Sequence, residues 1–136
     1  MCGRFNVIDN PGLQQLLRDL GIDLELPRGV NVAPTEAVML VRESGDDREM
    51  MPARWWLTPS WAKEVDQKYA MFNARSETVA DKPAFREAFA RRRCLVPVSG
   101  FYEWKRRGGQ SLPFYFSAPD DGLLALAGLW ERWEYP

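Results

Sequence analysis

The sequence contains no histidine among its 136 residues. Imidazole is the base of Ser-His-Asp and Cys-His nucleophile pairs, a common zinc ligand and the usual proton shuttle near neutral pH. The chain can form none of these from its own residues. Any chemistry that it performs must use carboxylates, amines, thiols or bound water.

Cysteine is nearly as scarce, because Cys2 and Cys94 are the only two. Two thiols are too few for a disulfide scaffold or a four-cysteine metal site. No apolar signal-peptide region follows Met1. The longest apolar run, Gly122–Trp130, is far shorter than the ~20 residues that span a bilayer. We therefore expect a soluble protein of a reducing compartment.

Net charge is also small, at -1, which provides no bulk attraction to nucleic acid or to an acidic membrane. The charges are unevenly distributed, however. Residues 85–107 carry seven basic and two acidic side chains, which gives this stretch a net charge of +5. Arginine provides fourteen of the eighteen basic residues, and its planar guanidinium suits phosphate binding and base stacking.

Hydrophobic residues make up 46% of the chain, enough for one globular domain with a core. Leucines at helical spacing predict a helix over Pro11–Leu20, with Asn10 as its N-cap and Gly21 at its end. A second helix is predicted over Asp81–Arg92, and Ser76 fits an N-cap.

The rest of the pattern is mostly that of strands. Leu26–Pro34 is interpreted as a loop and Tyr69–Ala74 as a buried strand. A strand pair interrupted at Ser99 and Gly100 is expected within Cys94–Lys105. The other expected strands are a hairpin of Val38–Arg42 with Arg48–Leu57, and the two segments Leu112–Ser117 and Leu123–Trp130. We expect a single α+β domain, mostly β, with two short helices.

Cys2 is the most informative residue. Removal of the initiator methionine would leave a terminal cysteine with both an α-amine, pKa ~7.7 to 8.0, and a thiol, pKa ~8.5. The amine can capture an aldehyde as an imine, and the thiol can then close a thiazolidine ring without any histidine. Judged by position alone, an ordinary residue of a frayed terminus is the favoured alternative.

A polar run follows the apolar residues 69–72. A helix cap explains Ser76 and Glu77 but leaves Asn73 and Arg75 unexplained. An amide and a guanidinium at the end of a buried segment are suited to holding a phosphate or sugar oxygen.

Glu103 lies among aromatic residues in Gly100–Lys105. Apolar neighbours disfavour the charged carboxylate, which would raise its pKa towards the range useful for general acid/base catalysis. Pairing with Lys105 or Arg75 on an edge strand is an equally favoured alternative.

Six tryptophans are many for a small domain. The loop Trp56–Trp61 is aromatic and hard to bury completely, and aromatic rings beside arginines form stacking platforms for unpaired bases. Packing in the core or at its rim is the alternative, favoured for at least Trp130 and Trp133.

Taken in order, several motifs resemble those of the SRAP family, the SOS-response-associated peptidases. They are Met1–Phe5, Asn31–Thr35, Arg54–Trp55 with Leu57, Pro59–Ala62, Asn73–Thr78, Arg92–Pro97, Gly100–Trp104 and Ala127–Glu131. The resemblance covers nearly the whole chain. It implies an SRAP-like fold, a partly closed sheet or barrel, over residues 1–136.

The resemblance also implies a sensor and processor of abasic sites in single-stranded DNA. Cys2 would be the nucleophile that crosslinks to the ring-opened sugar as a thiazolidine, which overrides the frayed-terminus alternative. Asn73 would hold Cys2 and the sugar, Glu103 would be the general acid/base, and Arg75 would contact the adjacent phosphate. Weaker candidates for the DNA groove are Arg4, Trp56, Arg86 and Trp104.

Family membership further implies removal of the residue before Cys2, here only Met1, and lyase activity at abasic sites. The expected partner is single-stranded DNA containing abasic sites. We expect a monomer of the cytoplasm, associated with the nucleoid in a bacterium, with no cofactor, metal or membrane contact.

Two departures from the family pattern matter. Trp56 occupies a position where the family commonly has glycine, so the DNA-facing loop is expected to differ. The family's later segment, with a histidine followed by Arg-Met-Pro, has no counterpart here. That histidine assists sugar opening and crosslink reversal, so its absence implies slower capture or reversal. Lack of that segment also implies an open sheet edge and exposed core.

Two other functions fit parts of the sequence. A mature Cys-Gly terminus also occurs in glutamine amidohydrolases with an N-terminal nucleophile, although the arginines, tryptophans and later motifs do not suit that activity. A module that binds single-stranded DNA without a covalent step is the non-enzymatic alternative.

Overall fold

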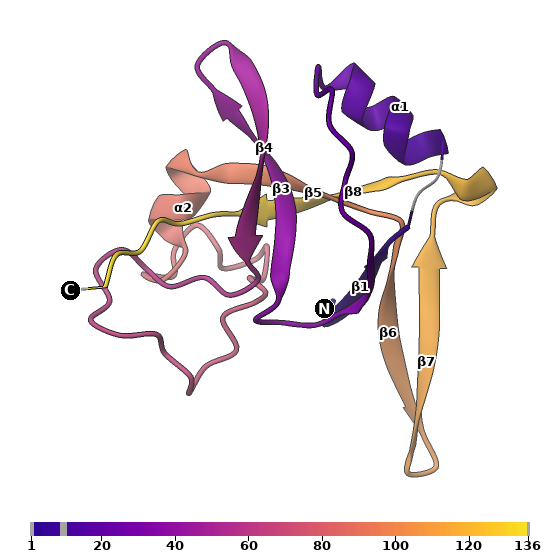
Figure 1. Ribbon diagram of the computed structural model, residues 1–136. Helices are drawn as coiled ribbons and strands as arrows, with labels where there is room; N and C mark the ends of the chain where they lie inside the picture. The colour runs from indigo at the N-terminus through magenta and orange to yellow at the C-terminus, as the bar shows by residue number, and fades with distance from the viewer. Residues whose placement is uncertain (1, 9–10, 136) are drawn as a thin grey trace.

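The computed structural model describes residues 2–8 and 11–135, which form eight strands, two α-helices and one short 3-10 helix (Figure 1). The predicted α+β class, mostly β with two short helices, is confirmed. In chain order the elements are β1 (Arg4–Val7), α1 (Pro11–Asp19), β2 (Gly29–Val32), β3 (Ala37–Ser44), β4 (Asp47–Arg54), α2 (Arg86–Arg91), β5 (Arg93–Val98), β6 (Gly100–Arg107), β7 (Gln110–Ser117), η1 (Pro119–Asp121) and β8 (Leu124–Leu129).

The strands form two antiparallel four-stranded sheets, ordered β2-β1-β6-β7 and β4-β3-β5-β8. The expected pairing within Cys94–Lys105 is wrong, because β5 and β6 belong to different sheets. The chain changes sheet at Ser99, which binds the end of β1. Its backbone N–H donates to the Asn6 carbonyl at 2.8 Å, and its hydroxyl accepts from the Ile8 N–H at 2.7 Å.

Two short strands correct the sequence interpretation of the first 34 residues. β1 is not among the predicted strands, and β2 lies inside the segment interpreted as a loop. Each has only four residues, so local propensity is weak, and pairing between them provides the stability. Asn31, in the left-handed region at φ 53°, donates its backbone N–H to the Asn6 side chain at 2.7 Å.

The helix predictions are partly confirmed. α1 ends one residue before the predicted end, and the predicted cap Asn10 lies outside the described residues. α2 is shorter than the predicted Asp81–Arg92, because the backbone N–H groups of Phe85 and Arg86 both donate to the Lys82 carbonyl, which makes a tight turn. No helix begins at Ser76, where the described chain forms turns instead.

The predicted strand Tyr69–Ala74 is also wrong, because the segment belongs to the long loop between β4 and α2. Tyr69 is 60% exposed, whereas Met71 is buried. Side chains and one backbone bond hold the segment. The Met71 carbonyl accepts from the Leu57 N–H at 2.9 Å, and the Phe72 carbonyl accepts from the Trp55 indole at 2.8 Å.

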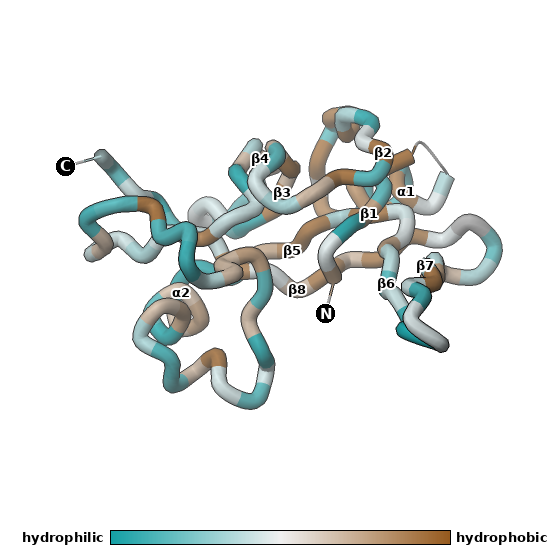
Figure 2. The backbone as a smooth tube through the Cα atoms, turned by 90° about the horizontal axis from the view of Figure 1, so that it is seen from below, coloured by the Kyte–Doolittle hydropathy of each residue, from teal (hydrophilic) through white to brown (hydrophobic). Residues whose placement is uncertain are grey.

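The core lies between the sheets and beneath α1. Leu13 of α1 packs in a cluster with residues of β1, β2 and β5, and Leu17 packs with Val41 of β3. Figure 2 shows hydrophobic residues along β5 and β3 and hydrophilic residues in the surrounding loops. A third cluster, around Met71 and Phe85, forms inside the long loop.

Strand β7 lies at one edge of its sheet within the described chain. All eight of its residues are exposed, and within the described chain β7 pairs only with β6. Large apolar side chains alternate along it: Leu112 is 38% exposed, Phe114 47% and Phe116 48%. Pro113, which has no backbone N–H, interrupts this edge.

We predict that Gly100→Ala destabilises the fold. Gly100 begins β6, and a Cβ there would overlap the Tyr115 ring and the Phe116 carbonyl oxygen. We expect a loss of about 1–3 kcal/mol in the free energy of unfolding, measured by urea denaturation. Gly3→Ala is the control, because its Cβ would meet nothing within 4 Å. Equal urea midpoints for the two variants would contradict the prediction.

Candidate active site

Cys2 lies directly before β1 and is half-buried against the apolar cluster that contains Phe5 and Val98. Its thiol donates a hydrogen bond to the Arg4 carbonyl, with Sγ and O 3.4 Å apart. Because β1 pairs with β2 on one side and β6 on the other, the backbone that follows Cys2 is held in the middle of a sheet. Cys2 is therefore fixed against the core.

Asn73 contacts Cys2 from the long loop between β4 and α2, 71 positions away in the sequence. Its side-chain amide donates to the Cys2 carbonyl oxygen at 2.5 Å. Asn73 directly follows Phe72, whose carbonyl is bound by the Trp55 indole. The half-buried indole of Trp55 also packs on Phe5, with ring centroids 4.9 Å apart. Trp55 thus joins the loop that carries Asn73 to the strand that follows Cys2.

Glu103 approaches from β6. The register pairs Arg4 with Tyr102, and its continuation by one residue sets Glu103 opposite Gly3. Burial is the main cause that raises the pKa of the Cys2 thiol; hydrogen bonding with the backbone of Arg4 opposes the rise, and the negative charge of Glu103 adds to it. Neither Lys105 nor Arg75 forms a salt bridge with Glu103 within the described residues.

Arg75 and Arg86, predicted to contact DNA, are both exposed. Arg75 lies two residues beyond Asn73, and Arg86 begins α2. Neither forms a salt bridge in the part of the chain that the structure describes. Arg92 differs, because it is bound to Glu131 at 2.8 Å and joins the end of α2 to the segment after β8.

The alternation of side chains along β6 separates the other candidates from Glu103. Arg4, Tyr102 and Trp104 lie on one face of the sheet, and Glu103 lies on the opposite face with Phe5. Arg4 is half-buried and donates to the Asn31 side chain at 3.1 Å. Trp104 is 46% exposed. The structure therefore brings Cys2, Asn73 and Glu103 together but not Trp104.

Trp56 has a structural role inside the long loop. It is half-buried, its indole donates to the Asp66 carbonyl at 3.1 Å, and its ring packs with Phe72. Trp61, five residues later, is 66% exposed. Of the aromatic loop, Trp61 rather than Trp56 presents the more accessible ring.

Two residues that support the site, Trp55 and Asn6, were assigned no role in it from the sequence. Trp55 anchors the loop, and the buried amide of Asn6 joins the Asn31 backbone N–H to the Tyr102 hydroxyl. No local pattern identified them, because each acts through a partner distant in sequence. For Trp55 two signals were available: it belongs to the motif Arg54–Trp55 and it directly precedes an aromatic loop.

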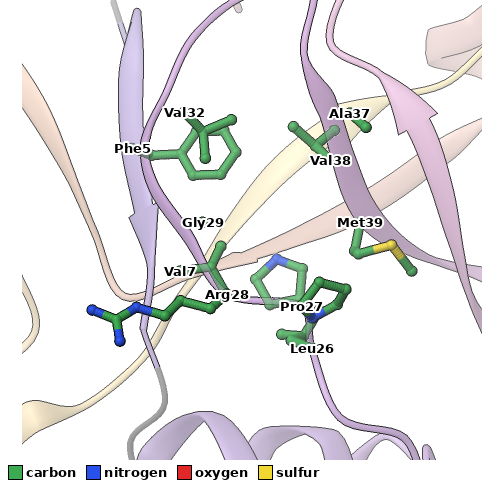
Figure 3. A pocket seen from close by; sticks show the side chains of 11 residues that line it. Phe5, Val7, Leu26, Pro27, Arg28, Gly29, Val32, Ala37, Val38 and Met39 are labelled. Atoms are coloured by element: carbon green, nitrogen blue, oxygen red, sulfur yellow. The ribbon is translucent and has the colours of Figure 1, made fainter.

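A cavity of ≈ 130 Å³ between β1, β2 and β3 is separate from these groups (Figure 3). Its walls are largely apolar, and Figure 3 shows the Arg28 guanidinium turned away from it. Cys2, Asn73 and Glu103 do not line it. Within the described residues no group of three or more acidic or cysteine side chains could hold a metal ion, and no helix is long and apolar enough to cross a membrane.

The fold and site define a mostly β domain in which a cysteine at the second position is held by an amide from a distant loop. A family model for SOS response associated peptidase (SRAP) matches residues 1–136, and the chain belongs to this family.

Three similar proteins indicate the extent of the match. "Abasic site processing protein YoqW" of Bacillus subtilis is 36% identical, over 100% of this chain and 62% of its own. "Abasic site processing protein YoaM" of the same species is 36% identical, over 98% and 60%. A crystal structure from Bordetella bronchiseptica has a TM-score of 0.77 at 27% identity, over 97% of this chain and 64% of that chain. The chain therefore spans about three fifths of these relatives' length.

We predict that the Cys2 thiol is less reactive in the folded chain than in the unfolded chain at the same pH. A raised pKa leaves a smaller fraction as thiolate, the nucleophilic form, so the pH midpoint of alkylation moves upward. Glu103→Gln removes a negative charge and should move that midpoint downward. Iodoacetamide labelling of the N-terminal peptide, quantified by mass spectrometry, measures both.

Cys94 provides an internal reference, because burial raises the pKa of its thiol to about 11. It should remain unlabelled over the range in which Cys2 reacts, and Glu103→Gln should not change its labelling. Identical midpoints for Cys2 in the wild-type chain and in Glu103→Gln would count against the placement of Glu103 beside Cys2.

Proposed function

We propose that this chain captures abasic sites in single-stranded DNA, forming a covalent thiazolidine link through Cys2. The observation that carries the proposal is the contact of Cys2 with Asn73 beside the carboxylate of Glu103. The relatives YoqW and YoaM, named abasic site processing proteins, support it. An abasic site in its ring-opened form offers the aldehyde that an amine and an adjacent thiol can trap.

The first step is hydrolysis of the peptide bond between Met1 and Cys2, which consumes one water and frees the Cys2 α-amine. The family's peptidase name fits this step, carried out by the chain on itself. The step supplies an amine near pKa ~8, a fraction of which is unprotonated at neutral pH.

Capture then follows in two bond-forming steps. The amine attacks the sugar aldehyde, and loss of one water gives an imine. The thiol adds to the imine carbon; a C–S bond forms, and the thiol proton passes to the nitrogen. Formation of the five-membered ring requires no oxidant and no metal, so the reaction needs only groups that the chain and the sugar supply.

Asn73 and Glu103 would share the supporting roles. The hydrogen bond from Asn73 fixes the Cys2 carbonyl, and with it the direction in which the neighbouring amine points. Glu103 would donate a proton as the sugar ring opens and accept one as the amine attacks. Because the chain has no histidine, we assign the general acid and base role to Glu103, whose charge acts on the Cys2 thiol.

The imine also accounts for a lyase activity. An iminium on the sugar acidifies the adjacent C2 hydrogen; removal of that proton expels the 3′ phosphate and breaks the strand. Closure of the thiazolidine removes the imine and so competes with cleavage. Crosslinking and strand cleavage are therefore alternative fates of one intermediate.

The DNA contacts we assign are electrostatic and aromatic. Arg75 and Arg86 are exposed cations without acidic partners in the described chain, suited to the phosphates beside the abasic sugar. Arg4 and Trp104 lie on the other face of the sheet and would contact nucleotides farther from the sugar. Trp56 would act indirectly, through the loop that it holds. Stacking on exposed rings favours unpaired bases, hence single-stranded DNA.

We predict that Cys2→Ala abolishes the denaturation-resistant adduct with an abasic single-stranded oligonucleotide, because the thiol that closes the ring is lost. Cys2→Ser keeps the amine, so an imine should still form and become trapped by borohydride. Cys94→Ala is the matched control and should retain the wild-type yield, since Cys94 is buried in β5. Denaturing gels and intact-mass spectrometry measure each product.

Two results would overturn this proposal. One is an undiminished adduct in Cys2→Ala, and the other is no adduct from wild-type chain whose Met1 removal has been verified by mass. Ammonia release from glutamine in place of an adduct would support the amidohydrolase alternative.

We predict that Glu103→Gln slows adduct formation by about 10²-fold, the usual contribution of a positioned acid or base. Glutamine keeps the size of the side chain but cannot exchange the proton. Single-turnover rates of adduct formation measure the difference. Glu77→Gln, at an exposed position in the loop, should leave the rate within about twofold, as expected for a surface change. Equal rates for Glu103→Gln and wild type would remove Glu103 from the mechanism.

A further inference from the structure

We propose that the end of the β6–β7 hairpin is a second nucleic-acid contact, which binds phosphates of the single strand at a distance from Cys2. We call Lys105–Gln110 the basic tip. The proposal rests on the proposed function, because it takes single-stranded DNA as the ligand. Lys105, Arg106 and Arg107 belong to the basic stretch 85–107, and none of them is among the residues assigned to the site around Cys2.

The basic tip extends away from the rest of the molecule. β6 and β7 pair along their whole length, from Gly100 with Ser117 to Arg107 with Gln110. Figure 1 shows the hairpin projecting beyond the other strands. Gly108 and Gly109 form the turn at positive φ, 56° and 77°, as a two-residue hairpin turn requires. A regular turn of this kind fixes the flanking side chains at the end of a rigid arm.

The charge of the basic tip is of one sign. Lys105, Arg106 and Arg107 are all exposed, and none forms a salt bridge within the described residues. The sequence has no acidic residue between Glu103 and Asp120. Three uncompensated cations at the end of an arm create a local positive potential that attracts a polyanion.

The other hairpin of the protein provides a contrast. Asp46 lies in the β3–β4 turn, Asp47 and Arg48 begin β4, and Arg42 is bound to Glu49. There the charges are mixed and partly paired, as on an ordinary solvated surface. The single sign of the basic tip is therefore not a general property of the hairpins in this chain.

The shape of the basic tip suits an anion. Residues Arg106–Ser111 line a shallow open hollow. The backbone N–H groups of Gly108 and Gly109 donate to no other group in the described chain. Glycine has no side chain to screen these donors, so a phosphate oxygen can approach them between the guanidinium groups. Backbone amides and arginines together are typical phosphate contacts.

Aromatic rings connect the basic tip to the rest of the sheet. Tyr102, Trp104 and Arg106 follow one another on the same face of β6. The Tyr102 ring lies 6.2 Å from that of Trp104 and 4.9 Å from that of Tyr115. Trp104 and Tyr115 are exposed and Tyr102 is half-buried between them, and aromatic rings followed by an arginine suit a strand whose bases stack and whose phosphate is neutralised.

The strand register gives the distance along β6 between the residues near Cys2 and the basic tip. Tyr102 pairs with Arg4, close to Cys2, and Arg107 lies five positions farther along β6. At ~3.4 Å per residue this is about 17 Å. A strand stacked at ~3.4 Å per nucleotide covers the same distance in about five nucleotides. The basic tip should therefore bind only when the strand extends about that far from the abasic site on one side.

The test compares Arg106→Ser/Arg107→Ser with Arg18→Ser/Arg48→Ser, which removes two exposed arginines elsewhere. The ligand is a fluorescent undamaged oligothymidylate, and anisotropy is measured at several salt concentrations. We expect the basic-tip variant to bind about tenfold more weakly. Its log–log salt slope should fall by about 1.4, because each phosphate that an arginine neutralises contributes ~0.7. The control variant should match wild type.

Adduct formation provides the second readout. The substrates are abasic oligonucleotides with a long flank on either the 5′ or the 3′ side of the abasic site. At protein concentrations below saturation, the basic-tip variant should crosslink more slowly than wild type to only one of these two substrates. With flanks of two nucleotides it should match wild type. This pattern separates a distant contact from a damaged active site, and circular dichroism of the variant verifies its fold.

Two results of the anisotropy comparison would overturn the inference: an unchanged salt slope in the basic-tip variant, or an equal loss of affinity in the control variant. A third would come from a vesicle-binding assay, if the basic-tip variant lost binding to anionic lipid vesicles but bound the oligothymidylate as wild type does. Failure of the proposed function would differ, because wild-type chain would then form no adduct while the salt-slope comparison still reports on the basic tip.

Discussion

The pairing of β1 on both sides is the constraint on which the rest of the structure depends. Residues at a chain terminus usually fray, yet here the strand from Arg4 to Val7 lies between β2 and β6. Asn6 reinforces both neighbours, because its buried amide binds the backbone of Asn31 and the hydroxyl of Tyr102. Cys2, the nucleophile that we propose, needs a defined position to react, and this pairing fixes the backbone that follows it.

The long loop between β4 and α2 is held by tryptophan rather than by a strand ladder. Three indole N–H groups donate to backbone carbonyls: Trp55 to Phe72, Trp56 to Asp66 and Trp133 to Ala62. Each bond satisfies a carbonyl that would otherwise need water, while the rings fill the space beneath the loop. Of the loop interpreted as a stacking platform, Trp56 is held in a structural contact and Trp61 is exposed, and Asn73 owes its position beside Cys2 to Trp55.

Sequence reasoning succeeded where the pattern was local and strong. The hairpin around Ser44–Asp47 and the amphipathic helix beginning at Pro11 are confirmed, because turn residues and leucine spacing act within a few positions. It failed for β1, β2 and the segment Tyr69–Ala74, where distant partners decide the conformation. The contact of Asn73 with Cys2 spans 71 positions, so only the resemblance to a family suggested it.

The amino-acid sequence by itself determined which chemistry was available: no imidazole, one cysteine at position 2, and a basic stretch over residues 85–107. It could not determine how these groups are distributed in space. Alternation along a strand separates Glu103 from Trp104 on local grounds, but only the pairing of β6 with β1 brings Glu103 towards Cys2, and the change of sheet at Ser99 directs the basic hairpin outward. These outcomes depend on strand pairing between distant segments, whose register no local sequence pattern specifies.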